Sequence, residues 1–293
     1  MTQPPAPILS GLRVLSLAPN LPGPAALRQL AAMGASCLKF DPPSGDPMAL
    51  YAPAFHGWLH EGIAVRIVDL KGAEGQQQLR TALGESDLLI TSSRPAALAR
   101  LGLTAERLAA DFPLLGWVEI VGDHAPHDDH PGHDLTYQAE AGLVRDQLPL
   151  TLLADMGGAL MATQAALELL VSRFRAESSA RQRHRRVALA EAARYLALPL
   201  QWGLTAPGAL LGGAHPGYQV LGCADGWVAL AALEPHFQKN LRQVIATDRP
   251  HLADESDLRT AAAAWCQGLS AEALNHRARQ NDLPLLAWVE QRC

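Results

Sequence analysis

Residues 123–134 gather the side chains that most often bind metals or move protons. Four histidines spaced three apart alternate with four aspartates: His124, His127, His130 and His133 with Asp123, Asp128, Asp129 and Asp134. Imidazole and carboxylate both bind first-row metals, so a metallohydrolase is one hypothesis. Pro126, Pro131 and Gly132 break the helix that would align this spacing. We therefore favour a solvated loop and predict no metal site.

Two other segments could bind phosphate. A dinucleotide-binding turn needs Gly-x-Gly-x-x-Gly, because backbone N–H groups must approach the phosphates. This chain has Leu21-Pro22-Gly23-Pro24 instead, and Pro24 lacks one such N–H. Asp41, where a ribose-binding acid would lie, is interpreted as a turn residue. The Arg-rich stretch 173–186 is interpreted as a solvated link between helices, since charge runs are usually exposed.

Composition narrows the function classes. The chain has 293 residues, of which 48% are hydrophobic and 18% charged, so we expect one large globular domain and a smaller one. A net charge of −5 argues against nucleic acid as a partner. The four cysteines form no CxxC pair and are interpreted as reduced thiols. No targeting segment or membrane-spanning run is found, and we expect a cytoplasmic protein.

Strand and helix patterns alternate in the first two thirds of the chain. Apolar runs typical of strands lie at 13–18, 36–40, 87–91 and 115–121, with helical patterns at 25–33, 96–101 and 104–110. This alternation predicts an α/β fold with a Rossmann-like doubly wound parallel sheet. Two long helical patterns, at 155–175 and at 187–200, are expected to pack on the sheet. We assign residues 1–200 to this large domain.

The pattern changes after residue 200. Asp225-Gly226 separates two short strand-like runs and predicts a hairpin, which two helical stretches at 257–269 and 271–280 follow. Ser270 is the expected N-cap of the second stretch. We therefore assign residues 201–293 to a smaller α+β domain.

Several short motifs occur in a fixed order along nearly the whole chain. They are Gly11-Leu12-Arg13-Val14-Leu15, Pro42-Pro43-Ser44-Gly45-Asp46-Pro47, Asp69-Leu70-Lys71, Ser93-Arg94-Pro95, Gly132-His133-Asp134, Ala154-Asp155-Met156-Gly157-Gly158 and Glu234-Pro235-His236-Phe237. In order and spacing they resemble the class III CoA transferases, also called the CaiB/BaiF family. The resemblance implies an acyl-CoA thioester as substrate and no separate cofactor, with CoA as part of the substrate.

The resemblance also implies site residues, and they differ between branches of the family. In the transferases an Asp at the position of Asp155 attacks the acyl-CoA to form a mixed anhydride, beneath a glycine-rich loop. In the α-methylacyl-CoA racemase branch a His at His133 joins that Asp, and a Glu at Glu234 supports the His. This chain has all three residues and lacks the glycine-rich loop between residues 230 and 237. It is closest to the racemase branch.

The chemistry of α-carbon inversion fits that set of residues. One group must remove the α-proton from one face while another delivers a proton to the opposite face, and His133 and Asp155 would be these groups. By resemblance, the backbone N–H of Asp134 would stabilise the enolate oxygen. Glu234 would orient His133. Taken singly, Asp155 and Glu234 could only cap helices, and His133 could be an ordinary loop histidine.

The chain departs from the family where CoA phosphates are bound. A basic segment before Asp69-Leu70-Lys71 is replaced by residues 59–64, which carry Glu61. Lys39, Arg94 and Arg66 remain as expected phosphate contacts. The small domain also ends early at Cys293, while family members form interlocked homodimers. We expect a homodimer, and we make no prediction about whether its two chains interlock.

Two alternatives to the racemase remain. The lost cations and the short C-terminal region fit a catalytically silent member of the family that binds another ligand or a partner chain. A CoA transferase that uses an Asp155 acyl anhydride is the other alternative.

Overall fold

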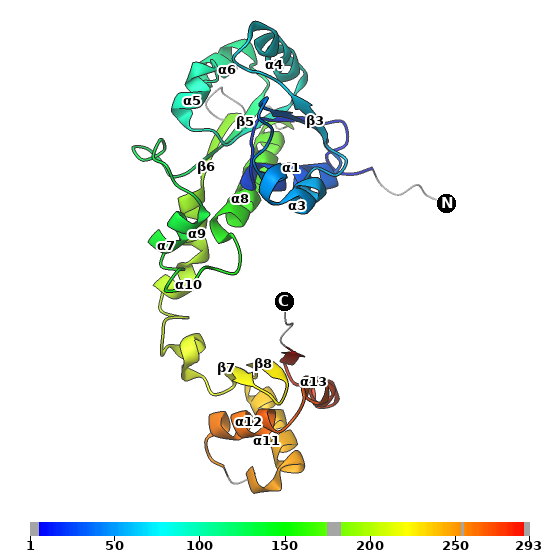
Figure 1. Cartoon of the computed structure of the whole chain (residues 1–293), viewed down its shortest axis with the longest axis vertical. Coiled ribbons are helices and arrows are strands. Elements are labelled where there is room, and N and C mark those ends of the chain that lie inside the picture. The colour runs from blue at the N-terminus through cyan, green and yellow to red at the C-terminus, as the bar shows by residue number, and fades with distance from the viewer. Residues whose placement is uncertain (1–5, 175–182, 253–254, 290–293) are drawn as a thin grey trace, which may run out of the picture. The chain divides into compact units, whose positions relative to one another are not determined.

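The computed structural model describes residues 6–174, 183–252 and 255–289. They form two compact units, Met1–Ala197 and Leu198–Cys293, each described by itself below (Figure 1). Among the described residues, no helix is both long and apolar enough to cross a bilayer. Cys37, Cys223 and Cys266 are free thiols, and Cys293 lies outside the described residues.

The first unit is built on a six-stranded sheet in which every neighbouring pair is parallel. The strands are β1 (Arg13–Ser16), β2 (Ser36–Asp41), β3 (Ala64–Ile67), β4 (Leu88–Thr91), β5 (Gly116–Val121) and β6 (His184–Ala188). Their order is β3-β2-β1-β4-β5-β6, so the chain reverses its direction of travel between β1 and β4. This is the doubly wound order of dinucleotide-binding folds, and the predicted fold class is confirmed.

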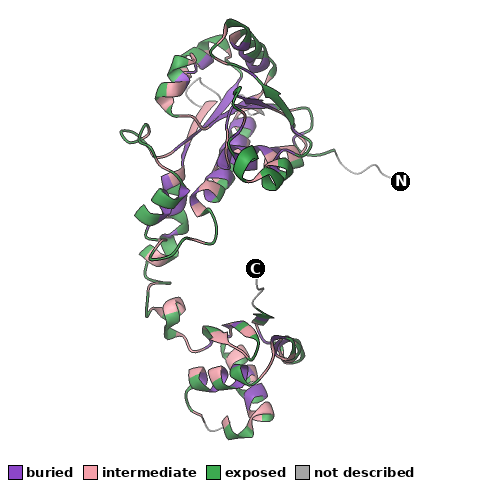
Figure 2. Cartoon of the chain, viewed as in Figure 1, coloured by how far each residue is buried: buried purple, intermediate pink, exposed green. Residues whose placement is uncertain are grey.

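Helices cover both faces of this sheet, because its strands are apolar on both sides. Leu88 and Ile90 pack toward α1 (Pro22–Ala32) and α8 (Leu153–Phe174). Leu89, between them, packs on the other face, which α4 (Ala73–Glu85), α5 (Pro95–Arg100) and α6 (Ala105–Asp111) cover. Figure 2 shows buried residues along these strands and on the helix sides that meet them.

The remaining helices of the first unit are short and lie in its connections. They are α2 (Met48–Tyr51), α3 (Pro53–Leu59), α7 (Asp134–Glu140) and α9 (Leu189–Leu196). Two predictions are corrected at residues 184–188, which form strand β6. The helix expected from residue 187 begins only at Leu189, and the end of the Arg-rich stretch, interpreted as a solvated link between helices, belongs to the sheet. Strand β6 pairs with the buried strand β5, and Glu119 of β5 bonds His184 and Arg186. Tertiary pairing therefore overrides the local helical pattern.

The second unit holds a three-stranded antiparallel sheet in the order β7-β8-β9. Its strands are β7 (Tyr218–Gly222), β8 (Gly226–Ala231) and β9 (Leu285–Val289), and the predicted hairpin at Asp225-Gly226 joins the first two. Its helices are α10 (Leu198–Gln201), a π-helical turn (Leu210–Ala214), α11 (Pro235–Asp248), a 3-10 turn (Pro250–Leu252), α12 (Leu258–Gln267) and α13 (Ala271–Gln280). Ser270 caps α13 by accepting the Ala273 N–H, as predicted.

Trp265, fully buried, lies in the hydrophobic core of this second unit.

We predict that Gly23→Ala destabilises the first unit. A Cβ at Gly23, in the first turn of α1, would lie 2.1 Å from the Cβ of Ala18, which follows β1. Both atoms belong to rigid elements, so relief requires moving the helix away from the sheet, at a cost of about 1–3 kcal/mol. Urea unfolding followed by circular dichroism measures this.

Gly57→Ala is the matched control. Gly57 lies inside α3, and a Cβ there meets no atom within 4 Å. That variant is expected to be as stable as the wild type or about 0.5–1 kcal/mol more stable. Equal unfolding midpoints for the Gly23 variant and the wild type would contradict the packing argument.

Candidate active site

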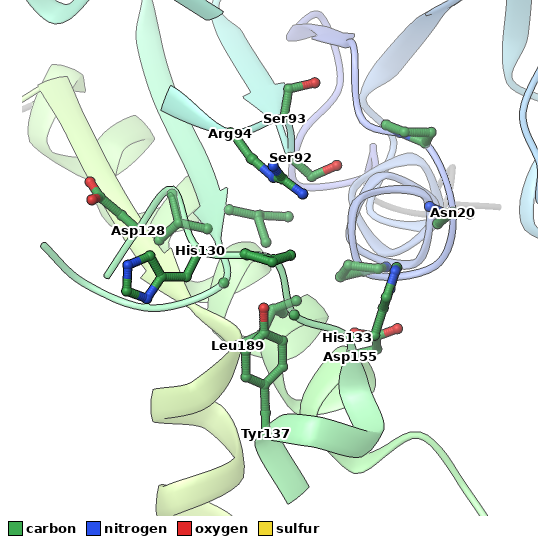
Figure 3. A pocket seen from close by; sticks show the side chains of 17 residues that line it. Asn20, Ser92, Ser93, Arg94, Asp128, His130, His133, Tyr137, Asp155 and Leu189 are labelled. Carbon is green, nitrogen blue, oxygen red and sulfur yellow. The ribbon is translucent and has the colours of Figure 1, made fainter. Parts of the chain in front are cut away.

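A cavity of about 230 Å³ lies beyond the carboxyl ends of β1, β4 and β5. Its walls come from the segments that follow these strands, and from α7 and α8 (Figure 3). The residues that line it include Pro19, Asn20, Ser92, Ser93, Arg94, Gly122, Gly132, His133, Tyr137 and Asp155. In open α/β sheets ligands bind where the strand order reverses, and β1 and β4 flank that point here. The sheet topology therefore makes this cavity the candidate active site.

His133 enters the cavity from the start of α7, where it is the N-cap residue. Its extended backbone is fixed by Thr136, whose hydroxyl accepts the His133 N–H at 3.1 Å and donates to the His133 carbonyl at 2.7 Å. The His133 side chain is exposed to solvent. The helix start thus holds the imidazole at the cavity wall and leaves it in reach of a ligand.

Asp155 reaches the same cavity from the first turn of α8. Its position depends on Asp134, which is only 4% exposed. One Asp134 carboxylate oxygen accepts the Asp155 N–H at 3.0 Å, and the other accepts from the buried side chain of Gln138. Asp134 therefore ties the start of α8 to the start of α7, so that His133 and Asp155 line the same cavity.

The same arrangement raises the pKa of Asp155 from 3.8 to about 7. Burial contributes most, because it penalises the ionised carboxylate, and the negative charge of Asp134 adds to it. A carboxyl group that titrates near neutral pH can act both as a proton donor and as a proton acceptor. Asp155 is thus suited to acid/base chemistry in this cavity.

Tyr137 lines the cavity and was not singled out from the sequence as a site residue. A Cβ at either Gly122 or Gly132 would lie 2.3 Å from its hydroxyl oxygen, so the phenol fills the space that these glycines leave. Burial and the charge of Asp155 raise the pKa of Tyr137, which stays a neutral hydroxyl. Its position three residues after the Gly132-His133-Asp134 motif was the available signal.

Asn20 is a second residue that sequence reasoning missed. It adopts a left-handed conformation with φ of 63°, between the end of β1 and α1. Its N–H donates to the Asp46 carboxylate, and its side-chain oxygen accepts from Tyr51. Asparagine tolerates this backbone conformation better than most residues, which was the signal in the sequence.

The three predicted phosphate contacts are placed differently from one another. Arg94 lines the cavity at the start of α5. Arg66 is exposed on the edge strand β3 and is not among the residues that line this cavity. Lys39 differs from the expectation, because it is fully buried and its ammonium lies 2.7 Å from Asp41 and 2.5 Å from Asp46. Its charge is already compensated inside the protein.

The His/Asp segment 123–134 is fixed to the sheet and α9 by ion pairs. Arg186 of β6 pairs with Asp128 at 2.8 Å, and Arg194 of α9 pairs with Asp123 at 2.7 Å. In the parts of the chain that the structure describes, these histidines form no metal-ligand group. The segment shapes the cavity rim through His130 and Asp128. Arg175 and Arg181 of the Arg-rich stretch lie outside the described residues.

The family model described as CoA-transferase family III matches residues 9–287. The chain belongs to CoA-transferase family III. The resemblance found in the sequence is thereby confirmed, and family III includes both CoA-transferases and a racemase.

The chain is similar to three known proteins. Cinnamoyl-CoA:phenyllactate CoA-transferase of Clostridium sporogenes is 32% identical over 142 residues, which are 44% of this chain and 34% of that protein. Alpha-methylacyl-CoA racemase of Mus musculus is 27% identical over 85% of this chain and 67% of that protein. The crystal structure of a hypothetical protein, Rv3272, from Mycobacterium tuberculosis shares the fold, with a TM-score of 0.82, 24% identity and coverage of 98% and 86%.

The chain spans about a third to two thirds of the length of the first curated relatives it matches. Most of these family III relatives are CoA-transferases.

Glu234 belongs to the second unit of this family III chain. It is the N-cap residue of α11, is exposed, and makes no side-chain capping hydrogen bond. Capping therefore does not account for its carboxylate. Its predicted role toward His133 stays a prediction.

The raised pKa of Asp155 predicts how stability depends on pH. The unfolded carboxyl ionises near pH 3.8 and the folded one near pH 7, so the folded chain binds more protons in between. The contribution of Asp155 to the free energy of unfolding is therefore highest near pH 4, where the folded carboxyl is protonated, and it decreases as the pH rises to 7. We expect Asp155→Asn to remove this loss and to be roughly 1–4 kcal/mol more stable than the wild type at pH 8.

Urea unfolding of both proteins at pH 4.5 and pH 8 measures the difference. Asp146→Asn, in the connection between α7 and α8, is the control and should follow the wild type. A stability difference between wild type and Asp155→Asn that stays constant with pH would show that Asp155 has an ordinary pKa.

Proposed function

We propose that this protein is an acyl-CoA α-carbon epimerase or racemase, which inverts a 2-methylacyl-CoA-like thioester through an enolate. The observation that carries the proposal is the meeting of His133 and Asp155 at one cavity, with the pKa of Asp155 raised to about 7. Inversion needs one proton acceptor and one proton donor at neutral pH. A neutral imidazole and a protonated carboxyl supply that pair.

The proposed reaction uses the two groups in turn. The neutral His133 imidazole takes the α-proton from one face, and the thioester becomes an enolate. Protonated Asp155 then gives its proton to the other face. After the product departs, His133 is an imidazolium and Asp155 is a carboxylate. In the reverse reaction the two residues exchange these roles. Asp155 near its pKa reaches both states at low cost.

Enolate stabilisation is assigned to the backbone of Asp134. Its N–H lies in the first turn of α7, where helical N–H groups have no acceptor within the helix. Such a fixed donor stabilises charge that develops on the thioester oxygen. Arg94, at the cavity wall, is the proposed phosphate contact for CoA, and we expect the enzyme to act as a homodimer.

A CoA-transferase is the second proposed function. The observation that favours it is the number of transferases among the family III relatives, including the one at 32% identity. In that reaction ionised Asp155 would attack the thioester carbonyl, release CoA thiolate and hold the acyl group as an anhydride. His133 has no necessary part in this step.

Exchange of the α-proton for solvent deuterium distinguishes the racemase from the CoA-transferase. With 2-methylacyl-CoA in D₂O, we expect the wild type to incorporate deuterium, followed by mass spectrometry or proton NMR. His133→Ala and Asp155→Asn should each slow exchange by about 100-fold or more, because each removes one acid/base group. His127→Ala, on the exposed rim of the same loop, should exchange at the wild-type rate.

A different set of results would favour the CoA-transferase. Absence of exchange in folded wild-type protein, with acyl transfer that survives in His133→Ala and disappears in Asp155→Asn, would overturn the racemase and establish the transferase. Hydroxylamine would then trap the acyl group as a hydroxamate. Absence of both reactions would favour the catalytically silent family member.

A further inference from the structure

Asp46, His56 and His60 form a side-chain cluster that the proposed reaction does not use. One potential ligand atom from each lies within 4.8 Å of those from the other two. Asp46 precedes α2, His56 lies on α3, and His60 directly follows α3. Among the described residues this is the one such group of three found in the chain.

The two imidazoles each present a buried nitrogen without a partner. The Nε2 atoms of His56 and His60 are inaccessible to solvent and make no hydrogen bond. His60 as a whole is only 9% exposed. A buried polar atom without a partner costs about 1–3 kcal/mol, so these two nitrogens are unexplained by the fold itself.

The hydrogen bonding of His60 sets which of its nitrogens carries the lone pair. Its Nδ1 lies 2.7 Å from the carbonyl oxygen of His56. A carbonyl can only accept, so Nδ1 carries the proton and Nε2 of the neutral ring is left with a free lone pair. Metal-binding histidines are usually oriented in this way, by an Nδ1–H bond to a carbonyl.

The charges around the cluster favour an added cation. Lys39 is the partner of both Asp41 and Asp46, so two buried carboxylates share one ammonium and leave a charge of −1. The Lys39 ammonium donates to Asp46 Oδ2, and Met48 N–H donates to Oδ1. The Asn20 N–H is shared between the two oxygens, at 3.1 Å from Oδ1 and 3.2 Å from Oδ2. Oδ1 has no ammonium on it, so we take it as the oxygen available to a cation beside the imidazoles.

We propose that Asp46, His56 and His60 form a binding site for a divalent transition-metal ion of the zinc type, outside the proposed active site. Two imidazoles and one carboxylate are a donor set that zinc takes, with a water in the fourth position. Zinc–ligand bonds of about 2.0 Å place neighbouring ligand atoms about 3.3 Å apart, so the side chains need only small rotations.

The site would link α3 to the segment that carries Asp46. Asp46 in turn holds the backbone of Asn20, which lines the cavity. Metal occupancy would therefore reinforce the cavity wall without contacting the reacting atoms. This inference does not depend on which reaction the cavity performs.

Zinc binding to the full-length protein tests the proposal. Protein treated with EDTA and dialysed is titrated with zinc chloride by calorimetry, and its zinc content is measured after gel filtration. We expect one zinc per chain and a higher melting temperature. His56→Gln and His60→Gln should each bind zinc at least about 100-fold more weakly, since loss of even an outer-shell partner costs 10–100-fold.

The double variant His127→Gln with His130→Gln is the matched control, because these loop histidines are the competing zinc ligands. It should bind zinc like the wild type. Cobalt(II) in place of zinc should give visible absorption typical of a tetrahedral site in the wild type and not in His60→Gln. Absence of zinc binding in the wild type would overturn the proposal, and so would binding that the loop variant abolishes and His60→Gln retains.

Discussion

The hydrogen bond from the Asp155 N–H to the Asp134 carboxylate is the interaction on which the site depends. It joins the start of α8 to the start of α7 at 3.0 Å, and thereby sets His133 and Asp155 on one cavity. The same carboxylate is a buried negative charge beside Asp155, so the residue that fixes the geometry also adds to the effect of burial in raising the pKa of Asp155. Position and acidity of the proposed catalytic groups are therefore coupled.

Another part of the cavity wall, at Asn20, depends on a buried charge cluster. Lys39 forms ion pairs with both Asp41 and Asp46, and Asp46 accepts the N–H of Asn20, whose backbone is left-handed where β1 turns toward α1. Removing one partner from such a cluster leaves an uncompensated buried charge, which costs far more than a surface ion pair. The left-handed Asn20 can persist because this cluster holds it in place.

Membership in CoA-transferase family III is compatible with two reactions at the same carboxylate. In the proposed reactions, ionised Asp155 would act as a nucleophile toward a thioester, and protonated Asp155 would act as an acid toward an enolate. A pKa near 7 places both forms within reach at neutral pH, and the presence of His133 supports the acid/base reaction. Under these proposals, the two reactions differ in the protonation state of Asp155 and in the need for His133.

The sequence alone determined the doubly wound fold, the hairpin at Asp225-Gly226 and the family, because these follow from local periodicity, turn chemistry and motif order. It also singled out His133 and Asp155 as a pair. Only the tertiary structure decided that residues 184–188 form a strand, that Lys39 is enclosed between Asp41 and Asp46, and that Asp46, His56 and His60 converge. Strand pairing, burial and convergence depend on contacts between distant segments, which no local pattern encodes.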